Sequence, residues 1–140
     1  MSDEVEDALV ARANSYAGVT AIIGSGSACR FYPVKLPQAP TYPACSYNVV
    51  SSPVVSAMGA DTGIARPRFS VGCWAETFKG ARDLATQVRK CFQRYNVVWA
   101  GPTNSVEILD VWKLTHMDLY DDAAKVHYRV VDFQVDHRDV

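Results

Sequence analysis

The hydrophobic pattern of the chain changes period once, sharply, between residues 64 and 92. Over residues 68 to 75 apolar and polar positions alternate, which is typical of a strand with one buried face. The apolar parity holds Phe69, Val71, Cys73 and Ala75. From Phe78 onward apolar residues recur every three or four positions, and Thr77 stands where a helix N-cap is expected. This segment therefore predicts a strand that runs directly into a helix packed on a sheet.

The rest of the pattern predicts a helix, a Pro-rich connection and further strands. A helical stripe covers residues 5–16 and is expected to end before Gly18. Prolines crowd residues 33–43, which excludes a helix or a central strand there. The predicted strands are a short edge strand at 30–33, a strand at 46–55 followed by a turn at 57–63, and two long strands at 106–120 and 126–138.

This order predicts an α+β fold: a mostly antiparallel sheet with two helices on one face, in the order helix, strand, strand, helix, strand, strand. The segment 106–120 carries apolar residues on both parities, so we expect two-sided burial or a bulge. In the closing strand Val131, Phe133 and Val135 are expected to face the core.

Length and composition narrow the class of protein. A chain of 140 residues predicts one domain, residues 1–140, with a core large enough to need no metal or disulfide. The net charge of -1 argues against a general affinity for nucleic acid or membranes. No apolar run is long enough to span a bilayer, and the acidic opening is unlike a signal peptide, so a cytosol-like compartment is expected.

Motifs that would indicate catalysis are absent from the sequence. The chain has no Gly-rich phosphate loop, no Gly-x-Ser-x-Gly elbow and no His-Glu-x-x-His pair, so we expect no enzyme and no cofactor. The four cysteines are widely spaced, without a Cys-x-x-Cys pair, which favours free buried thiols over zinc or a redox couple. Cys73 and Cys91 fall on predicted core faces, where a thiol ionises poorly and is a weak candidate nucleophile.

Two alternatives to a purely structural protein remain open. His116 and His127 could face each other across the last hairpin, with Asp118 nearby, and hold a metal ion if the strand register allows it. His137 lies too far along the strand to join them. A small-ligand-binding protein is the second alternative, with a cleft whose lining is expected from Trp112, Tyr120, Tyr128 and His127.

Charge is segregated along the chain. Residues 64–94 hold seven bases and two acids, whereas residues 118–140 hold three bases and six acids. A solvated helix face is one interpretation, and head-to-tail assembly of a basic surface on an acidic one is another. Contact with DNA is a third and weaker interpretation, because the whole chain is close to neutral.

Trp74 also bears on assembly. It shares a parity with Arg68 and Ser70, so it is expected to point away from the core face of its strand. A large aromatic side chain in that position needs a cover, either from another protein or from the Pro-rich connection of the same chain.

With these elements placed, the chain resembles the tail-completion or tail-terminator family of tailed bacteriophages, which also occurs in gene transfer agents. The resemblance covers nearly the whole chain. It rests on Arg30-Phe31-Tyr32-Pro33, on the Pro-rich approach 42–47, on Ala65-Arg66-Pro67-Arg68-Phe69 with Gly72-Cys73-Trp74-Ala75, on Asp118-Leu119-Tyr120-Asp121 and on 128–135. The turn after Gly24 is longer here than the family pattern, and Pro67 interrupts a strand that is usually more regular.

The resemblance implies a virion protein that assembles in the host cytoplasm into a ring, expected to be a hexamer, at the head-proximal end of the tail tube. Such a ring ends tube polymerisation and offers a surface to the head-tail connector or stopper protein, with DNA at most passing through its lumen and no membrane involved. Exposure arguments, and no family motif, select the expected contact residues: Val55, Met58, Asp61, Arg66, Arg68 and Trp74.

Overall fold

The structure is a computed structural model that describes residues 4–24, 26, 29–51, 54–57, 60–100 and 105–139. Helices and strands follow one another along the chain in the order α1 (Glu4–Ser15), α2 (Ala17–Ile23), β1 (Phe31–Pro33), β2 (Ala44–Ser51), β3 (Val54–Ala57), β4 (Ala60–Ala65), β5 (Arg68–Ala75), α3 (Phe78–Phe92), β6 (Val97–Ala100), β7 (Ser105–Asp121) and β8 (Val126–Asp139). The fold is α+β, as the pattern predicted.

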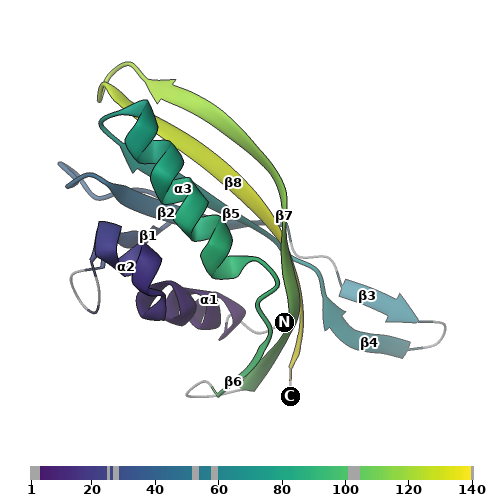
Figure 1. Ribbon diagram of the computed structural model, residues 1–140. Coiled ribbons are helices and arrows are strands. Elements are labelled where there is room, and N and C mark those ends of the chain that lie inside the picture. Colours follow the sequence, from purple (N-terminus) through teal and green to yellow (C-terminus); the bar gives the residue numbers. More distant parts are fainter. Residues whose placement is uncertain are drawn as a thin grey trace.

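The sheet is mixed and strongly curved (Figure 1). Its central strands run antiparallel in the order β2-β5-β8-β7, and β1 adds to β2 in parallel at one edge. β4 joins β8 through Ile64 and Ala65, and β6 joins the start of β7. The expected order with two helices is wrong, because the described residues form three helices and eight strands.

The additional helix is α2, which follows α1 after a break at Tyr16. The first helix ends at Ser15, before Gly18 as expected, and Gly18 is the second residue of the additional helix. A Cβ on Gly18 would lie 2.2 Å from Oε1 of Gln87 on α3. A side chain at Gly18 would meet the end of the Gln87 side chain, so the glycine leaves the space that Gln87 occupies between α2 and α3.

The connection between β2 and β5 holds a hairpin where a turn at 57–63 was expected. β3 and β4 pair antiparallel across this segment and project from the sheet, away from the helices (Figure 1). β6 is a further strand that the pattern did not predict. Four-residue strands such as β3 and β6 are too short to show a reliable alternation, so tertiary pairing decides them.

Other expectations are confirmed. β5 runs into α3 after two residues, and Oγ1 of Thr77 accepts a hydrogen bond from the Gly80 amide at 3.0 Å, as an N-cap should. β7 and β8 form the long closing hairpin. Register shifts between Ile108 and Asp110 and between Lys113 and Thr115 are the bulges expected in β7.

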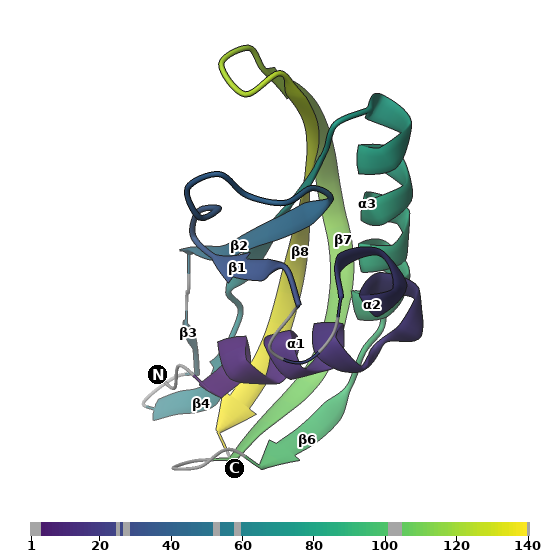
Figure 2. The same ribbon diagram turned by 90° about the vertical axis from the view of Figure 1, so that its left-hand side faces the viewer.

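The core lies between the three helices and one face of the sheet (Figure 2). Phe92 of α3 stands at its centre, with its ring centroid 5.6 Å from that of Phe133 and 5.8 Å from that of Phe69. All three rings are fully buried, and Val131 and Val135 of β8 lie in the same core, as predicted. In the described part of the chain no helix is both long and apolar enough to cross a membrane.

Candidate interaction surface

The face of the sheet away from the helices carries a ladder of side chains, which we call the bare face. Strand register sets its rows: Leu119, Tyr128 and Trp74 stand side by side on β7, β8 and β5. Met117, Val130 and Gly72 form the next row, which β2 continues with Ser46. Within the described residues no helix covers this face (Figures 1 and 2), so its apolar side chains meet solvent in the isolated chain.

Trp74 is held in a fixed orientation on the bare face. Its indole stacks on the ring of Tyr128, with centroids 4.0 Å apart and planes 12° apart. Nε1 of the indole donates a hydrogen bond to Oγ of Ser46 at 3.1 Å. A Cβ on Gly72 would lie 3.0 Å from that same nitrogen, so the absence of a side chain at Gly72 leaves room for the indole. The predicted outward direction of Trp74 is confirmed.

Further along the bare face, two ion pairs join β8 to the start of β5 and to the residues just before it. Nη2 of Arg68 lies 2.7 Å from Oδ2 of Asp132, and Nε of Arg66 lies 3.5 Å from Oδ1 of Asp136. Both arginines belong to the basic segment of the sequence, and both aspartates to the acidic one. Arg94 of the same basic segment pairs with Asp110 of β7 at 2.5 Å. Two of the seven bases of the basic segment are therefore paired with the acidic segment of the same chain.

The second half of β7 is a free edge of the sheet. Among the described residues, β6 pairs β7 only up to Ile108, so the strand beyond it has a hydrogen-bonded neighbour on the β8 side alone. Side chains there are exposed: 44% for Leu114, 61% for Met117, 38% for Leu119 and 48% for Tyr120. The expected two-sided burial of this strand is wrong for its second half. A long, apolar, exposed edge strand is a site of association between chains.

The Pro-rich connection borders the bare face but does not cover Trp74 completely. A cavity of about 280 Å³ separates the two, lined on the loop side by Pro37, Pro40 and Tyr42 and on the sheet side by Trp74. Asp121, at the end of β7, also lines the cavity. Trp74 therefore borders an open cavity whose lining is partly apolar and partly polar, with Lys35, Ser46 and Asp121 among the polar residues.

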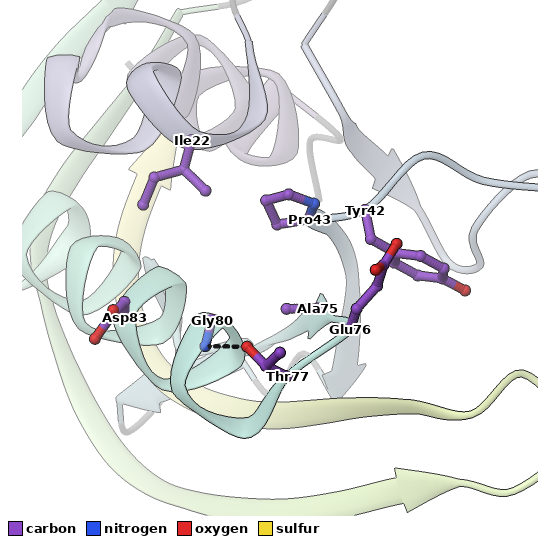
Figure 3. A pocket seen from close by; sticks show the side chains of 8 residues that line it. All are labelled: Ile22, Tyr42, Pro43, Ala75, Glu76, Thr77, Gly80 and Asp83. Carbon is purple, nitrogen blue, oxygen red and sulfur yellow. Dashed lines mark hydrogen bonds between the residues drawn. The ribbon is translucent and has the colours of Figure 1, made fainter.

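A second cavity, of about 440 Å³, lies on the helix side of the molecule (Figure 3). Ile22 of α2 and Pro43 of the Pro-rich connection face the start of α3 across it. Its polar rim consists of Glu76, Thr77 and Asp83. The Thr77 side chain is engaged with the Gly80 amide, so the groups left on the lining that can exchange a proton are the carboxyls of Glu76 and Asp83 and the phenol of Tyr42.

The metal-site alternative is not supported by the register. His116 lies opposite Val131, whereas His127 lies opposite Tyr120, about 13 Å further along the hairpin at the usual rise per residue. Asp118, the expected third ligand, forms a bidentate ion pair with Arg129 at 2.6 and 3.1 Å, and this bond lowers the pKa of Asp118. The described residues hold no group of three side chains able to bind a metal ion.

The ligand-cleft alternative fails for a related reason. Tyr128 stands in the row of Trp74 on the bare face, whereas His127, its neighbour in β8, pairs with Tyr120 and Ala75 on the helix side. The four expected lining residues are therefore divided between two faces. All four thiols are free, and Cys45, Cys73 and Cys91 are buried as expected, whereas Cys29 is half-exposed. Burial raises the pKa of Cys91 to about 12.

The expected contact residues fall in two places. Arg66, Arg68 and Trp74 lie along β5 and its approach, on the bare face. Val55 lies on β3 and Asp61 on β4, in the projecting hairpin, and Met58 falls outside the described residues. Sequence reasoning missed the free edge of β7; its signal is the run of apolar side chains from Leu114 to Tyr120 on both parities of one strand.

The model of the family described as tail completion protein gp17 matches residues 7–137. The chain belongs to this family. Membership identifies it as a structural protein of the tail of phage-like virions, in agreement with the family that the sequence resembles. A bare sheet face and a free sheet edge are features expected of a tail completion protein, since such a protein works against other proteins of the virion.

Solved structures share the fold of this tail completion protein. A chain in a structure titled as the virion of a native gene transfer agent particle has a TM-score of 0.68 at 14% identity, covering 94% of this chain and 92% of that one. A second solved structure has a TM-score of 0.53 at 12% identity, covering 100% of this chain and 96% of that one. No curated protein matches the sequence.

Proposed function

We propose that residues 1–140 form one tail-terminator domain, copies of which close into a ring, a hexamer in our proposal, on the head-proximal end of the tail tube. The ring ends tube polymerisation and presents the surface on which the head is joined. Family membership supports the tail role. Our proposal adds three points to this: that copies form a ring, that the ring has six subunits, and that it lies on the head-proximal end of the tube.

The observation that carries the proposal is the free edge of β7. Native proteins usually protect an edge strand with charges, prolines or a covering segment. Here the edge bears Leu114, Met117, Leu119 and Tyr120, all more than a third exposed. Burial of such side chains stabilises a contact by roughly 25 cal/mol per Å² of apolar surface removed from water. The opposite sheet edge, at β1, is formed by different residues, so an edge-to-edge contact is head-to-tail and closes into a ring if the rotation allows.

The proposed mechanism of termination is geometric. A ring that matches the symmetry of the last tube layer binds it through one surface, and its other surface lacks what a further tube subunit needs. No bond is made or broken, which agrees with the structural character of the family. Elongation stops because the tube end is no longer accessible.

The partners follow from this position. We propose the tail tube protein below the ring, and the head-tail connector or stopper protein above it, with DNA passing through the lumen at most. The contact residues that we assign to the subunit and tube interfaces are Val55 and Asp61 of the β3–β4 hairpin, Met58 between them in sequence, and Arg66, Arg68 and Trp74. The projection of the hairpin from the sheet supports its use as an arm that reaches a neighbour (Figure 1).

Light scattering coupled to gel filtration, followed by negative-stain microscopy of the peak, tests the ring. The proposal predicts a particle of several subunits with a central channel. A monomer that also fails to bind tube ends would contradict it. A small closed dimer that is stabilised by a metabolite would instead favour a ligand-binding protein.

A further inference from the structure

Two buried thiols face each other across the β2–β5 pair. Cys45 of β2 and Cys73 of β5 are register partners in these antiparallel strands. Both are fully buried and belong to the core cluster, so both side chains project to the helix side of the sheet. The alternation along β5 agrees, because Trp74, the next residue, points to the bare face. The two thiols therefore start from neighbouring points on one face.

Backbone hydrogen bonds show which kind of antiparallel pair the two cysteines form. The Cys45 amide donates to the carbonyl oxygen of Arg30 at 2.8 Å, on the β1 side of β2. Two residues further along β2, the carbonyl oxygen of Tyr47 accepts from the Val34 amide at 2.7 Å, on the same side. A strand residue directs its N–H and C=O to the same neighbour, so those of Cys45 point away from β5. Cys45 and Cys73 are thus a non-hydrogen-bonded pair.

The spacing of such a pair admits a disulfide. In a non-hydrogen-bonded antiparallel pair the Cα atoms lie about 4.5 Å apart and the side chains approach most closely. Disulfides join Cα atoms that are about 4.4–6.8 Å apart, so the spacing of β2 and β5 lies within this range. Burial, and after it a hydrogen bond with the Cys73 side chain, raise the pKa of Cys45 well above its usual range, which agrees with two thiols in contact.

The other two thiols are placed differently. Cys91 of α3 directs Sγ to the carbonyl oxygen of Arg12, 3.8 Å away. Cys29 precedes β1 and is half-exposed. Among the described strands, no other register pair joins two cysteines. The geometry therefore selects one pair out of the four thiols.

We propose that Cys45 and Cys73 are an oxidative modification site, at which hydrogen peroxide forms a disulfide that links β2 to β5. Peroxide is small and uncharged, so it suits a pair that is reached only through brief local opening of the strands. One cysteine, as the thiolate, attacks peroxide: an S–O bond forms, the O–O bond breaks, and the departing hydroxide takes up the thiol proton to give water. The second sulfur attacks the resulting sulfenic acid, so that the S–S bond forms, the S–O bond breaks and a second water leaves. The two cysteines are oxidised by two electrons, and peroxide is reduced to two molecules of water.

A virion protein meets the conditions for this change, because it passes from a reducing cytosol to an oxidising medium, where disulfides persist. The bond would close a loop that holds the whole β3–β4 hairpin. It would also attach β2, the neighbour of the β1 edge strand, covalently to the middle of the sheet. The inference concerns a single chain and does not depend on the ring.

Peroxide treatment of the full chain tests the site. Remaining thiols would be alkylated in denaturant, and peptides would be mapped by mass spectrometry without reduction. We expect the wild type to yield one cross-linked peptide pair, through Cys45 and Cys73. Cys73→Ala should yield none, whereas Cys91→Ala, which removes an equally buried thiol outside the pair, should yield the same linkage as the wild type.

Thermal unfolding measures whether the bond links the strands in the folded protein. A disulfide restricts the unfolded chain, so we expect oxidation to raise the midpoint temperature of the wild type by about 5 °C or more, and dithiothreitol to reverse the rise. Cys73→Ala should show no rise that dithiothreitol reverses.

Four outcomes would overturn the inference. Cys45 and Cys73 could both stay reduced while half-exposed Cys29 has reacted. The linkage could pass through Cys29 or Cys91, or between two chains. Either cysteine of the pair could oxidise to the sulfinic acid without a linkage. A linked wild type whose midpoint temperature does not rise would show that the bond does not hold β2 on β5.

Discussion

Replacement of Trp74 by alanine is the sharpest test of the bare face. The substitution removes two interactions of the indole: its stack on the ring of Tyr128, with centroids 4.0 Å apart, and its hydrogen bond to Ser46 at 3.1 Å. An aromatic pair contributes about 0.5–1.5 kcal/mol beyond burial, and a hydrogen bond contributes a similar amount. We therefore expect Trp74→Ala to lower the free energy of unfolding by about 1–3 kcal/mol, less than the roughly 3–5 kcal/mol typical of an aromatic ring removed from a core.

Urea unfolding, followed by circular dichroism at a concentration where the chain is monomeric, measures this loss. Tyr128→Ala and the double variant complete a thermodynamic cycle, for which we expect a coupling of about 1 kcal/mol between the two rings. Ser46→Ala is the matched control, since it removes only the hydrogen-bond acceptor. A loss near that of a core aromatic would show that Trp74 belongs to the core, and a coupling of zero would refute the stack. In either case the bare face would not be as described.

Three further predictions concern the edge, one ion pair and the thiols. Met117→Glu should weaken association while changing the free energy of unfolding by no more than about 0.5 kcal/mol, because the side chain is 61% exposed; unchanged light scattering would count against the edge contact. Arg129 lowers the pKa of Asp118, so their pair stabilises the fold above the ordinary aspartate pKa of about 3.9 and loses that effect as the pH falls through the lower folded value. The midpoint temperature of thermal unfolding of Asp118→Asn should accordingly lie below that of the wild type at pH 7 and equal it in strong acid. A difference that persists in strong acid would show that the ion pair is not its cause. Burial raises the pKa of Cys91 to about 12, so iodoacetamide at about pH 8 should label half-exposed Cys29 first and Cys91 only after unfolding, as peptide mass spectrometry would show; early labelling of Cys91 would contradict its burial.

The part of the fold that sequence reasoning predicted is the part set by local periodicity. The strand from Arg68 and the helix from Phe78 each carry a long, regular apolar pattern, and Thr77 marks the boundary between them. The same parity argument gave the direction of Trp74. In these segments each side chain's position follows from its own neighbours in sequence.

The parts that were missed depend on contacts between distant segments. The first helix ends before Gly18 as expected, but the second helix, α2, was missed, and it packs against α3, which is far away in sequence. The register of His116 depends on bulges in β7 that shift the pairing of every later residue. The pairing of Arg68 with Asp132 depends on β5 and β8 being neighbours in the sheet. Periodicity contains no information about which strands are adjacent.

Addition of the purified protein to purified tail tubes tests the central claim most directly. Tubes would be incubated with the protein, supplied with fresh tube protein and examined by negative-stain microscopy for their length and for density at their ends. The account predicts a ring at one end of each tube and no further growth from that end. Growth from both ends at the rate seen without the protein would contradict it.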